Sequence, residues 1–153
     1  MAAITGELAV EFNLPDTDAR LRGLSEFHRL GPVVLLFQPT AYGLRSRLQF
    51  WSLLRHYDHF VELAAEIVVV TGDPLPEARI LQIRRGLPFV FLSDRNGTVA
   101  QTYGVEPGEC GGYVITVGGM IRYQRCGRRC SGTEMLHELR RLAVSELIPQ
   151  GQA

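Results

Sequence analysis

Short apolar runs alternate with segments of helical periodicity along most of this chain. The runs at 32–37, 66–71 and 89–93 are almost continuously apolar, as in strands that are covered on both faces. Apolar positions at helical spacing predict helices over 45–65, 76–85 and 133–147. The sequence therefore predicts a β-α-β-α-β core, with a further helix near the C-terminal end of the chain.

Two of these helices have a predicted core face. Within 45–65, the apolar positions expected to pack inward are Leu48, Trp51, Leu54, Phe60, Val61 and Leu63. Within 133–147, they are Met135, Leu136, Leu139, Leu142, Ala143 and Leu147. Both assignments rest on the helical period, because residues three or four positions apart lie on the same side of a helix.

A β-hairpin is predicted before the last helix. The runs 113–117 and 120–124 are separated by Gly118 and Gly119, and glycine supplies the positive φ angles that a tight turn needs. Alternating strands and helices followed by a hairpin predict an α/β sandwich with parallel crossover units. Within that class, a terminal hairpin and helix are typical of the thioredoxin fold.

Length and composition narrow the expected class. The 153 residues fit one domain, expected over 1–148 with a loose tail at 149–153. Basic and acidic residues number 16 each, so net charge favours neither nucleic acid nor a membrane surface as partner. No run is long enough to span a bilayer, and no glycine motif opens a helix to cradle a nucleotide cofactor. The N-terminus does not read as a signal peptide, so a cytoplasmic location is expected.

Six segments in the same order resemble the peroxiredoxins, the alkyl hydroperoxide reductase and thiol-specific antioxidant family. The most specific are 86–94 (Gly-Leu-Pro-Phe-Val-Phe-Leu-Ser-Asp) and 99–105 (Val-Ala-Gln-Thr-Tyr-Gly-Val). The others are 12–18 followed by 24–27, then 32–39, then 56–60 followed by 65–70, and finally 113–123. The resemblance implies a thioredoxin-like, peroxiredoxin-type α/β/α sandwich with a central mixed sheet. It also implies thiol redox chemistry of the antioxidant type.

The family's active-site motif is Pro-x-x-x-Thr-x-x-Cys, with the cysteine in the first turn of a long helix. There the thiolate faces unpaired backbone N–H groups and the positive helix end, and a nearby arginine lowers its pKa further. In this chain Pro39 matches the proline, Gly43 falls at the threonine, and Ser46 falls at the nucleophilic cysteine. Gln49 fits the polar residue usual three positions later, whereas Cys110 falls where the family has its arginine.

A serine at this position changes the expected chemistry. It cannot follow the sulfenic-acid cycle of cysteine, and serine catalysis needs a positioned base. His56 and His59 lie ten and thirteen residues downstream of Ser46, which is about 15–20 Å along a helix. The sequence therefore predicts that the usual peroxidase mechanism is lost. Ser46 is expected to be a solvated or capping residue of the first helical turn.

The three cysteines offer alternatives. Cys126 and Cys130 flank a Gly-Arg-Arg segment, where cationic neighbours would favour thiolate. They fit incidental thiols or a structural disulfide, or else a catalytic, resolving or sensing pair. Cys110 is either a loop residue or a displaced nucleophile with Arg45 or Arg47 beside it. No metal is expected, because zinc would need a fourth ligand beyond Cys126, Cys130 and His137.

Several functional interpretations remain open at this stage. One is an active thiol-dependent peroxidase or disulfide oxidoreductase that uses Cys110 or the Cys126/Cys130 pair. A related one is an engineered Cys-to-Ser replacement at position 46. Another is a binding or regulatory module without catalysis. The resemblance further implies a homodimer, and a thiol reductant or another protein as partner.

Overall fold

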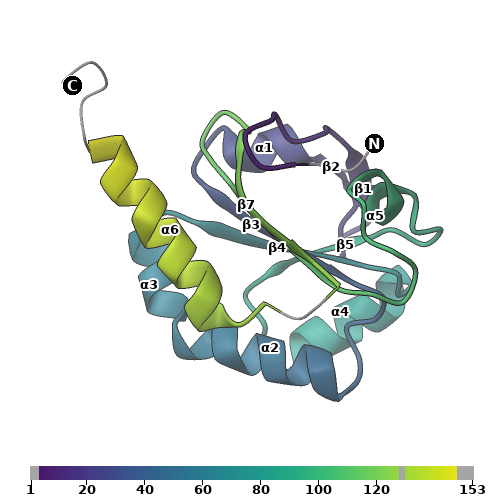
Figure 1. Ribbon diagram of the computed structural model, residues 1–153. Coiled ribbons are helices and arrows are strands. Elements are labelled where there is room, and N and C mark those ends of the chain that lie inside the picture. Colours follow the sequence, from purple (N-terminus) through teal and green to yellow (C-terminus); the bar gives the residue numbers. More distant parts are fainter. Residues whose placement is uncertain (1–3, 128–129, 148–153) are drawn as a thin grey trace.

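A five-stranded mixed sheet forms the centre of the molecule (Figure 1). The computed structural model describes residues 4–127 and 130–147. The strands are β3 (Val33–Gln38), β4 (Glu66–Thr71), β5 (Val90–Ser93), β6 (Gly111–Ile115) and β7 (Ile121–Cys126). Their order is β5-β4-β3-β6-β7. Strands β3, β4 and β5 are parallel, and the β6–β7 hairpin is antiparallel to β3 and within itself. The predicted α/β class with a terminal hairpin is confirmed.

Helices cover one face of this sheet, and a short hairpin with two short helices covers the other (Figure 1). The first layer holds α2 (Leu44–Arg55), α3 (Tyr57–Glu62), α4 (Leu75–Arg84) and α6 (Gly132–Leu147). The second layer holds β1 (Asn13–Pro15), β2 (Leu21–Gly23), α1 (Leu24–His28) and α5 (Thr98–Thr102). The second layer was absent from the sequence prediction, because its elements are too short to show a hydrophobic period.

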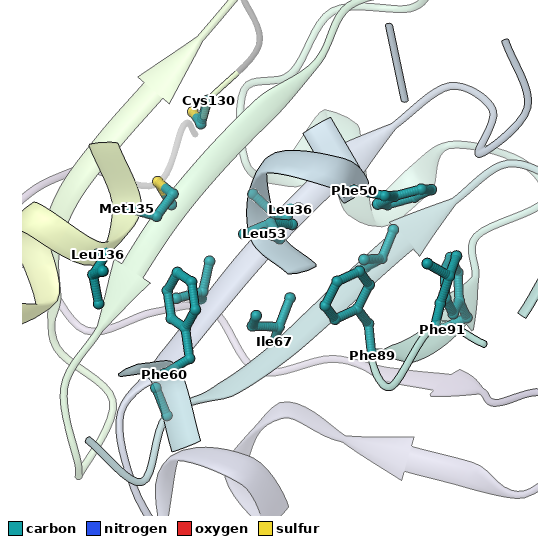
Figure 2. Close-up of a cluster of buried hydrophobic side chains, with 14 of the residues drawn as sticks. Leu36, Phe50, Leu53, Phe60, Ile67, Phe89, Phe91, Cys130, Met135 and Leu136 are labelled. Atoms are coloured by element: carbon teal, nitrogen blue, oxygen red, sulfur yellow. The ribbon is translucent and has the colours of Figure 1, made fainter. Parts of the chain in front are cut away.

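The central strand β3 supplies both cores. All six of its residues are buried, and alternation sends Val34 and Leu36 to one face and Val33, Leu35 and Phe37 to the other. A strand with helices or hairpins on both sides reads as a continuous apolar run, which is why the sequence predicted it. Figure 2 shows the core under α2, α3 and α6, where Phe50 of α2 and Phe60 of α3 pack with Leu36 and Ile67 of the sheet.

The helix predicted over 45–65 is two helices. They are α2 and α3, and the chain leaves helical geometry between them at His56 (φ −111°, ψ 11°). Neither proline nor glycine marks this break, so the pattern gave no signal of it. At this break the chain contacts another helix: the His56 ring nitrogen Nε2 lies 3.1 Å from the hydroxyl of Thr133 in α6.

The predicted core face of this region is wrong for most of its members. Leu48, Trp51 and Leu54 are 44%, 57% and 38% exposed, and Val61 is exposed as well. The side of α2 that packs on the sheet carries Ser46, Gln49, Phe50 and Leu53. Two of these four are polar, and the hydrophobic pattern therefore pointed to the opposite side of the helix.

The remaining elements follow the prediction with small shifts. Helix α6 buries Met135, Leu136, Leu139 and Leu142, as expected, while Ala143 is half-buried. The Leu147 side chain and the predicted tail at 149–153 lie outside the described residues. Strand β6 begins at Gly111 rather than Tyr113, because the glycines pair in the ladder. Among the residues described, no helix is long and apolar enough to cross a membrane.

Replacing two leucines on opposite sides of α2 tests its orientation. Leu53→Ala removes a fully buried side chain and should lower the free energy of unfolding by about 2–5 kcal/mol. Leu48→Ala, on the exposed side, should change it by no more than about 0.5 kcal/mol. Urea unfolding of both variants measures the difference. Equal losses, or a larger loss for Leu48→Ala, would contradict this orientation.

Candidate functional site

The carboxylate of Asp73 holds the loop between β3 and α2 in place. Asp73, which follows β4, accepts hydrogen bonds from the Thr40 hydroxyl at 2.7 Å and from the Ala41 N–H at 2.6 Å. The Thr71 hydroxyl donates to the same carboxylate at 2.7 Å. Ser93 in β5 donates its hydroxyl to the Asp73 backbone carbonyl. Hydrogen bonds to a charged group are stronger than neutral ones, so Asp73 fixes this loop to the ends of β4 and β5.

Gly43 precedes α2 in a backbone conformation that favours glycine. Its φ is 106° and its ψ is 169°, and no atom lies within 4 Å of where a Cβ would stand. The space is open, so the obstacle to a side chain is backbone strain and not crowding. The threonine that the family motif has at this position would therefore be strained in this loop.

Ser46 is the third residue of α2 and is buried, with 6% of its surface exposed. Its hydroxyl donates a hydrogen bond to the Thr40 carbonyl at 2.7 Å. The expectation of a solvated or capping serine is therefore wrong, because Gly43 is the N-cap and the hydroxyl is directed to the preceding loop. His56 and His59 lie beyond the far end of α2, as the sequence predicted.

Gln49 is one turn further along α2 and forms a buried bridge. Its side-chain oxygen accepts from the Gln38 amide at the end of β3, and its own amide donates to the Cys130 carbonyl at 2.7 Å. It thus joins the helix to the central strand and to the segment between β7 and α6. Gln38 is itself buried, and its side-chain oxygen has no hydrogen-bond partner among the described residues.

The three cysteines lie near one end of the β6–β7 hairpin. Cys110 immediately precedes β6, Cys126 ends β7, and Cys130 lies two residues before α6. Cys126 and Cys130 are free thiols, so the structure does not hold the structural disulfide that was one of the alternatives for this pair. Cys126 is exposed and its sulfur lies 3.1 Å from the Tyr113 hydroxyl.

Cys130 differs from the thiol that the sequence predicted. Burial, with the nearby Glu134 carboxylate, raises its pKa to about 12, and Arg125 opposes this shift only in part. The expectation that arginine neighbours favour a thiolate is therefore wrong for Cys130. Cys110 is half-buried, and Arg45 and Arg47 are exposed residues of α2.

The described residues contain no group of three or more His, Cys, Asp or Glu side chains that could hold a metal ion. His137, the third zinc ligand considered from the sequence, is exposed on α6.

A cavity of about 390 Å³ opens where the parallel strands end, and the sequence did not reveal it. Its walls include Pro39 after β3, Gly72 after β4, Asp94 and Arg95 after β5, and Glu106. The carboxyl ends of parallel strands are a common place for ligand sites in α/β proteins. Ser46 is not among the lining residues, so Pro39 is the motif residue that this cavity shares with the loop.

Comparison with known proteins identifies the family. The model of the AhpC/TSA family matches residues 5–124, and the chain belongs to that family. A putative peroxiredoxin of Mycobacterium tuberculosis is 35% identical over 111 residues, which cover 70% of each chain. Peroxiredoxin Q of Oryza sativa subsp. japonica is 30% identical over 125 residues, which are 77% of this chain and 57% of the relative. The peroxiredoxin resemblance of the sequence is confirmed.

Solved structures show the same architecture. Peroxidoxin BcpB from Mycobacterium tuberculosis superposes with a TM-score of 0.83 and 26% identity, covering 92% of this chain and 98% of that one. The reduced 2-Cys peroxiredoxin of Plasmodium vivax, at 17% identity, gives a TM-score of 0.81 over 94% of this chain and 99% of that one. The thioredoxin-like fold of the peroxiredoxin type is therefore confirmed.

The backbone at Gly43 can be tested by restoring the motif's threonine. Gly43→Thr should destabilise the fold by about 1–3 kcal/mol, because a β-branched residue is strained at this φ and ψ. Leu44→Thr is the control, since it places threonine at the next, exposed position of ordinary geometry. Urea unfolding compares the two variants. A neutral or stabilising Gly43→Thr would show that the loop adopts another conformation.

Proposed function

We propose that this protein is a peroxiredoxin-like redox protein that has lost the usual peroxidase mechanism of its family. The observation that carries the proposal is the state of Ser46. The residue at the place of the family's nucleophile is a buried serine whose hydroxyl donates to the Thr40 carbonyl. A serine hydroxyl so engaged has no base to accept its proton and no access to the sulfenic-acid cycle.

The place of Ser46 in the fold supports this correspondence. It lies in the first turn of the helix that follows Pro39 and the central strand, seven residues after that proline. This is the position where unpaired N–H groups and the helix dipole stabilise an anion. In this chain the dipole acts on a hydroxyl that stays protonated, so it supplies no nucleophile.

Two other positions of the family's pattern also differ in this chain. Gly43 supplies no hydroxyl, and Cys110 supplies no cation where the motif has its arginine. A peroxide at this place would therefore lack both the group that holds its oxygens and the charge that polarises them. Because three positions differ together, restoring cysteine at 46 alone does not rebuild the site.

A peroxide-consumption assay with dithiothreitol as reductant tests this proposal. The unmodified protein and Ser46→Ala should consume hydrogen peroxide at the same rate, because the hydroxyl takes no part in turnover. Ser46→Cys should gain little, and Ser46→Cys with Cys110→Arg should gain more than Ser46→Cys alone. Fast turnover by the unmodified protein that Ser46→Ala abolishes would overturn the proposal.

A homodimer through the outer side of α2 and α3 is the second part of this proposal. Leu44, Leu48 and Trp51 are 70%, 44% and 57% exposed and lie on one side of α2. Arg47 and Arg55 flank them, and the Arg55 guanidinium stacks 4.8 Å from the Trp51 ring. A row of exposed apolar side chains with a polar border is typical of an interface.

Charge complementarity favours a second copy as the occupant of this surface. Helix α2 contains three arginines and no acidic residue, whereas α3 exposes Asp58 and Glu62. In an antiparallel pair of copies, the basic α2 of one copy meets the acidic α3 of the other. Direct α2–α2 overlap would instead place arginine against arginine.

Sedimentation velocity over a range of concentrations tests the dimer. The unmodified protein should sediment as a dimer, and Trp51→Ser should shift it to monomer at the same concentration. Ile83→Ser, which removes an apolar residue of α4 that is slightly more exposed than Trp51, is the matched control and should leave the dimer intact. A monomeric unmodified protein, or a dimer insensitive to Trp51→Ser, would refute this interface.

A further inference from the structure

The two faces of the β6–β7 hairpin separate the cysteines. Gly112 faces α6, because an added Cβ there would lie 2.5 Å from the Cys130 sulfur and 3.4 Å from Leu36. Gly111 points to the opposite face, where an added Cβ would meet Val105. Cys130 therefore lies over Gly112, at the edge of the core cluster shown in Figure 2.

Cys126 lies on the other face of the hairpin. It is the ladder partner of Gly111, and its sulfur contacts the Tyr113 hydroxyl. Tyr113 belongs to the core on the side of α1 and α5, not to the cluster that holds Cys130. Cys126 and Cys130 thus belong to opposite faces of the hairpin, although only three residues separate them in sequence.

Cys110 is placed on the face of Cys130. It lies two residues before Gly112, and the ladder continues through it because the Gly127 N–H donates to its carbonyl at 2.9 Å. Alternation along a strand then directs Cys110 to the same side as Gly112, about 6.6 Å away. The Cys130 Cβ would lie 3.3 Å from a Cβ at Gly112. The two cysteines therefore lie on the same face of the hairpin, on either side of Gly112, and Cys110 is an electrostatic neighbour of the Cys130 thiol.

Gln38, at the end of β3, gives a second observation on the corner of the sheet that holds Cys110 and Cys130. In the β3–β6 ladder, the last pair is Phe37 with Gly111, and the same register continued by one residue would bring Gln38 opposite Cys110. Gln38 is 4% exposed, and its side-chain oxygen has no hydrogen-bond partner among the described residues. An unsatisfied buried acceptor costs free energy, so this corner is not optimised as a static core. Gln49 further joins it to the Cys130 carbonyl.

We propose that Cys110 and Cys130 are a redox pair that closes a reversible disulfide when a hydroperoxide oxidises Cys110. This inference does not depend on the loss of chemistry at Ser46. It also differs from a pairing of Cys126 with Cys130, which the sequence spacing suggests, because those two cysteines belong to opposite faces of the hairpin.

The chemistry divides the two cysteines into distinct roles. The Cys110 thiolate attacks one oxygen of the hydroperoxide, the O–O bond breaks, and the alkoxide leaves as an alcohol with a proton, which gives a sulfenic acid at Cys110. The Cys130 sulfur then attacks the Cys110 sulfur, loses its proton and releases water as the disulfide forms. Cys110 meets the hydroperoxide because it is only half-buried, whereas Cys130 is buried and can meet only the sulfenic acid formed on its own face of the hairpin.

Peptide mapping after mild oxidation tests the pairing on the full chain. The reduced protein is treated with hydrogen peroxide, blocked with an alkylating reagent, digested with trypsin and analysed by mass spectrometry. Arg122, Arg125 and Arg129 separate the three cysteines into different tryptic peptides. The expected product joins the Cys110 and Cys130 peptides, and free thiols fall from three to one per chain. That product should disappear on addition of dithiothreitol.

Cysteine variants decide between this pair and the alternatives. Cys126→Ser is the matched control and should retain the cross-link, whereas Cys110→Ser and Cys130→Ser should each abolish it. Circular dichroism checks the fold of Cys130→Ser, and Cys110→Ser tests the pair without changing the buried thiol. A cross-link that includes Cys126, or oxidation of each cysteine singly, would overturn the proposal.

Discussion

The packing of α2 on the central strand depends on the buried amide of Gln49. It accepts from Gln38 in β3 and donates to the Cys130 carbonyl, so one side chain connects the helix, the sheet and the segment that leads into α6. Burying an amide without partners costs several kcal/mol, and these hydrogen bonds remove much of that cost. The helix can therefore turn a partly polar side to the core and leave Leu48 and Trp51 outside.

The orientation of α2 also explains why Ser46 is buried and hydrogen-bonded. Once Gln49 faces the sheet, Ser46 lies one turn earlier on the same side and is buried with it. Its hydroxyl needs an acceptor, and the Thr40 carbonyl provides one because Asp73 holds that loop against β4 and β5. The first turn of α2 is thus held to the preceding loop by a hydrogen bond from a buried hydroxyl.

Much of the framework could be predicted from the sequence. The buried strands of the parallel sheet, the terminal hairpin and the core face of α6 follow from apolar runs and periodicity, since burial on both faces leaves a local signal. The family motif likewise placed Pro39, Gly43 and Ser46 around the start of one helix. Short elements such as β1, β2, α1 and α5 left no such signal, and the break at His56 depends on a contact with another helix.

What the sequence determined by itself was therefore the class of fold and the identity of the residues at the motif positions. Tertiary structure alone decided which side of α2 is buried, because polar Ser46 and Gln49 find their partners in distant segments. It also decided the environment of each thiol. Cys126 and Cys130 are close in sequence but lie on opposite faces of the sheet, whereas Cys110 and Cys130, twenty residues apart, share one. The physical reason is that strand alternation and register, not spacing along the chain, determine which side chains meet.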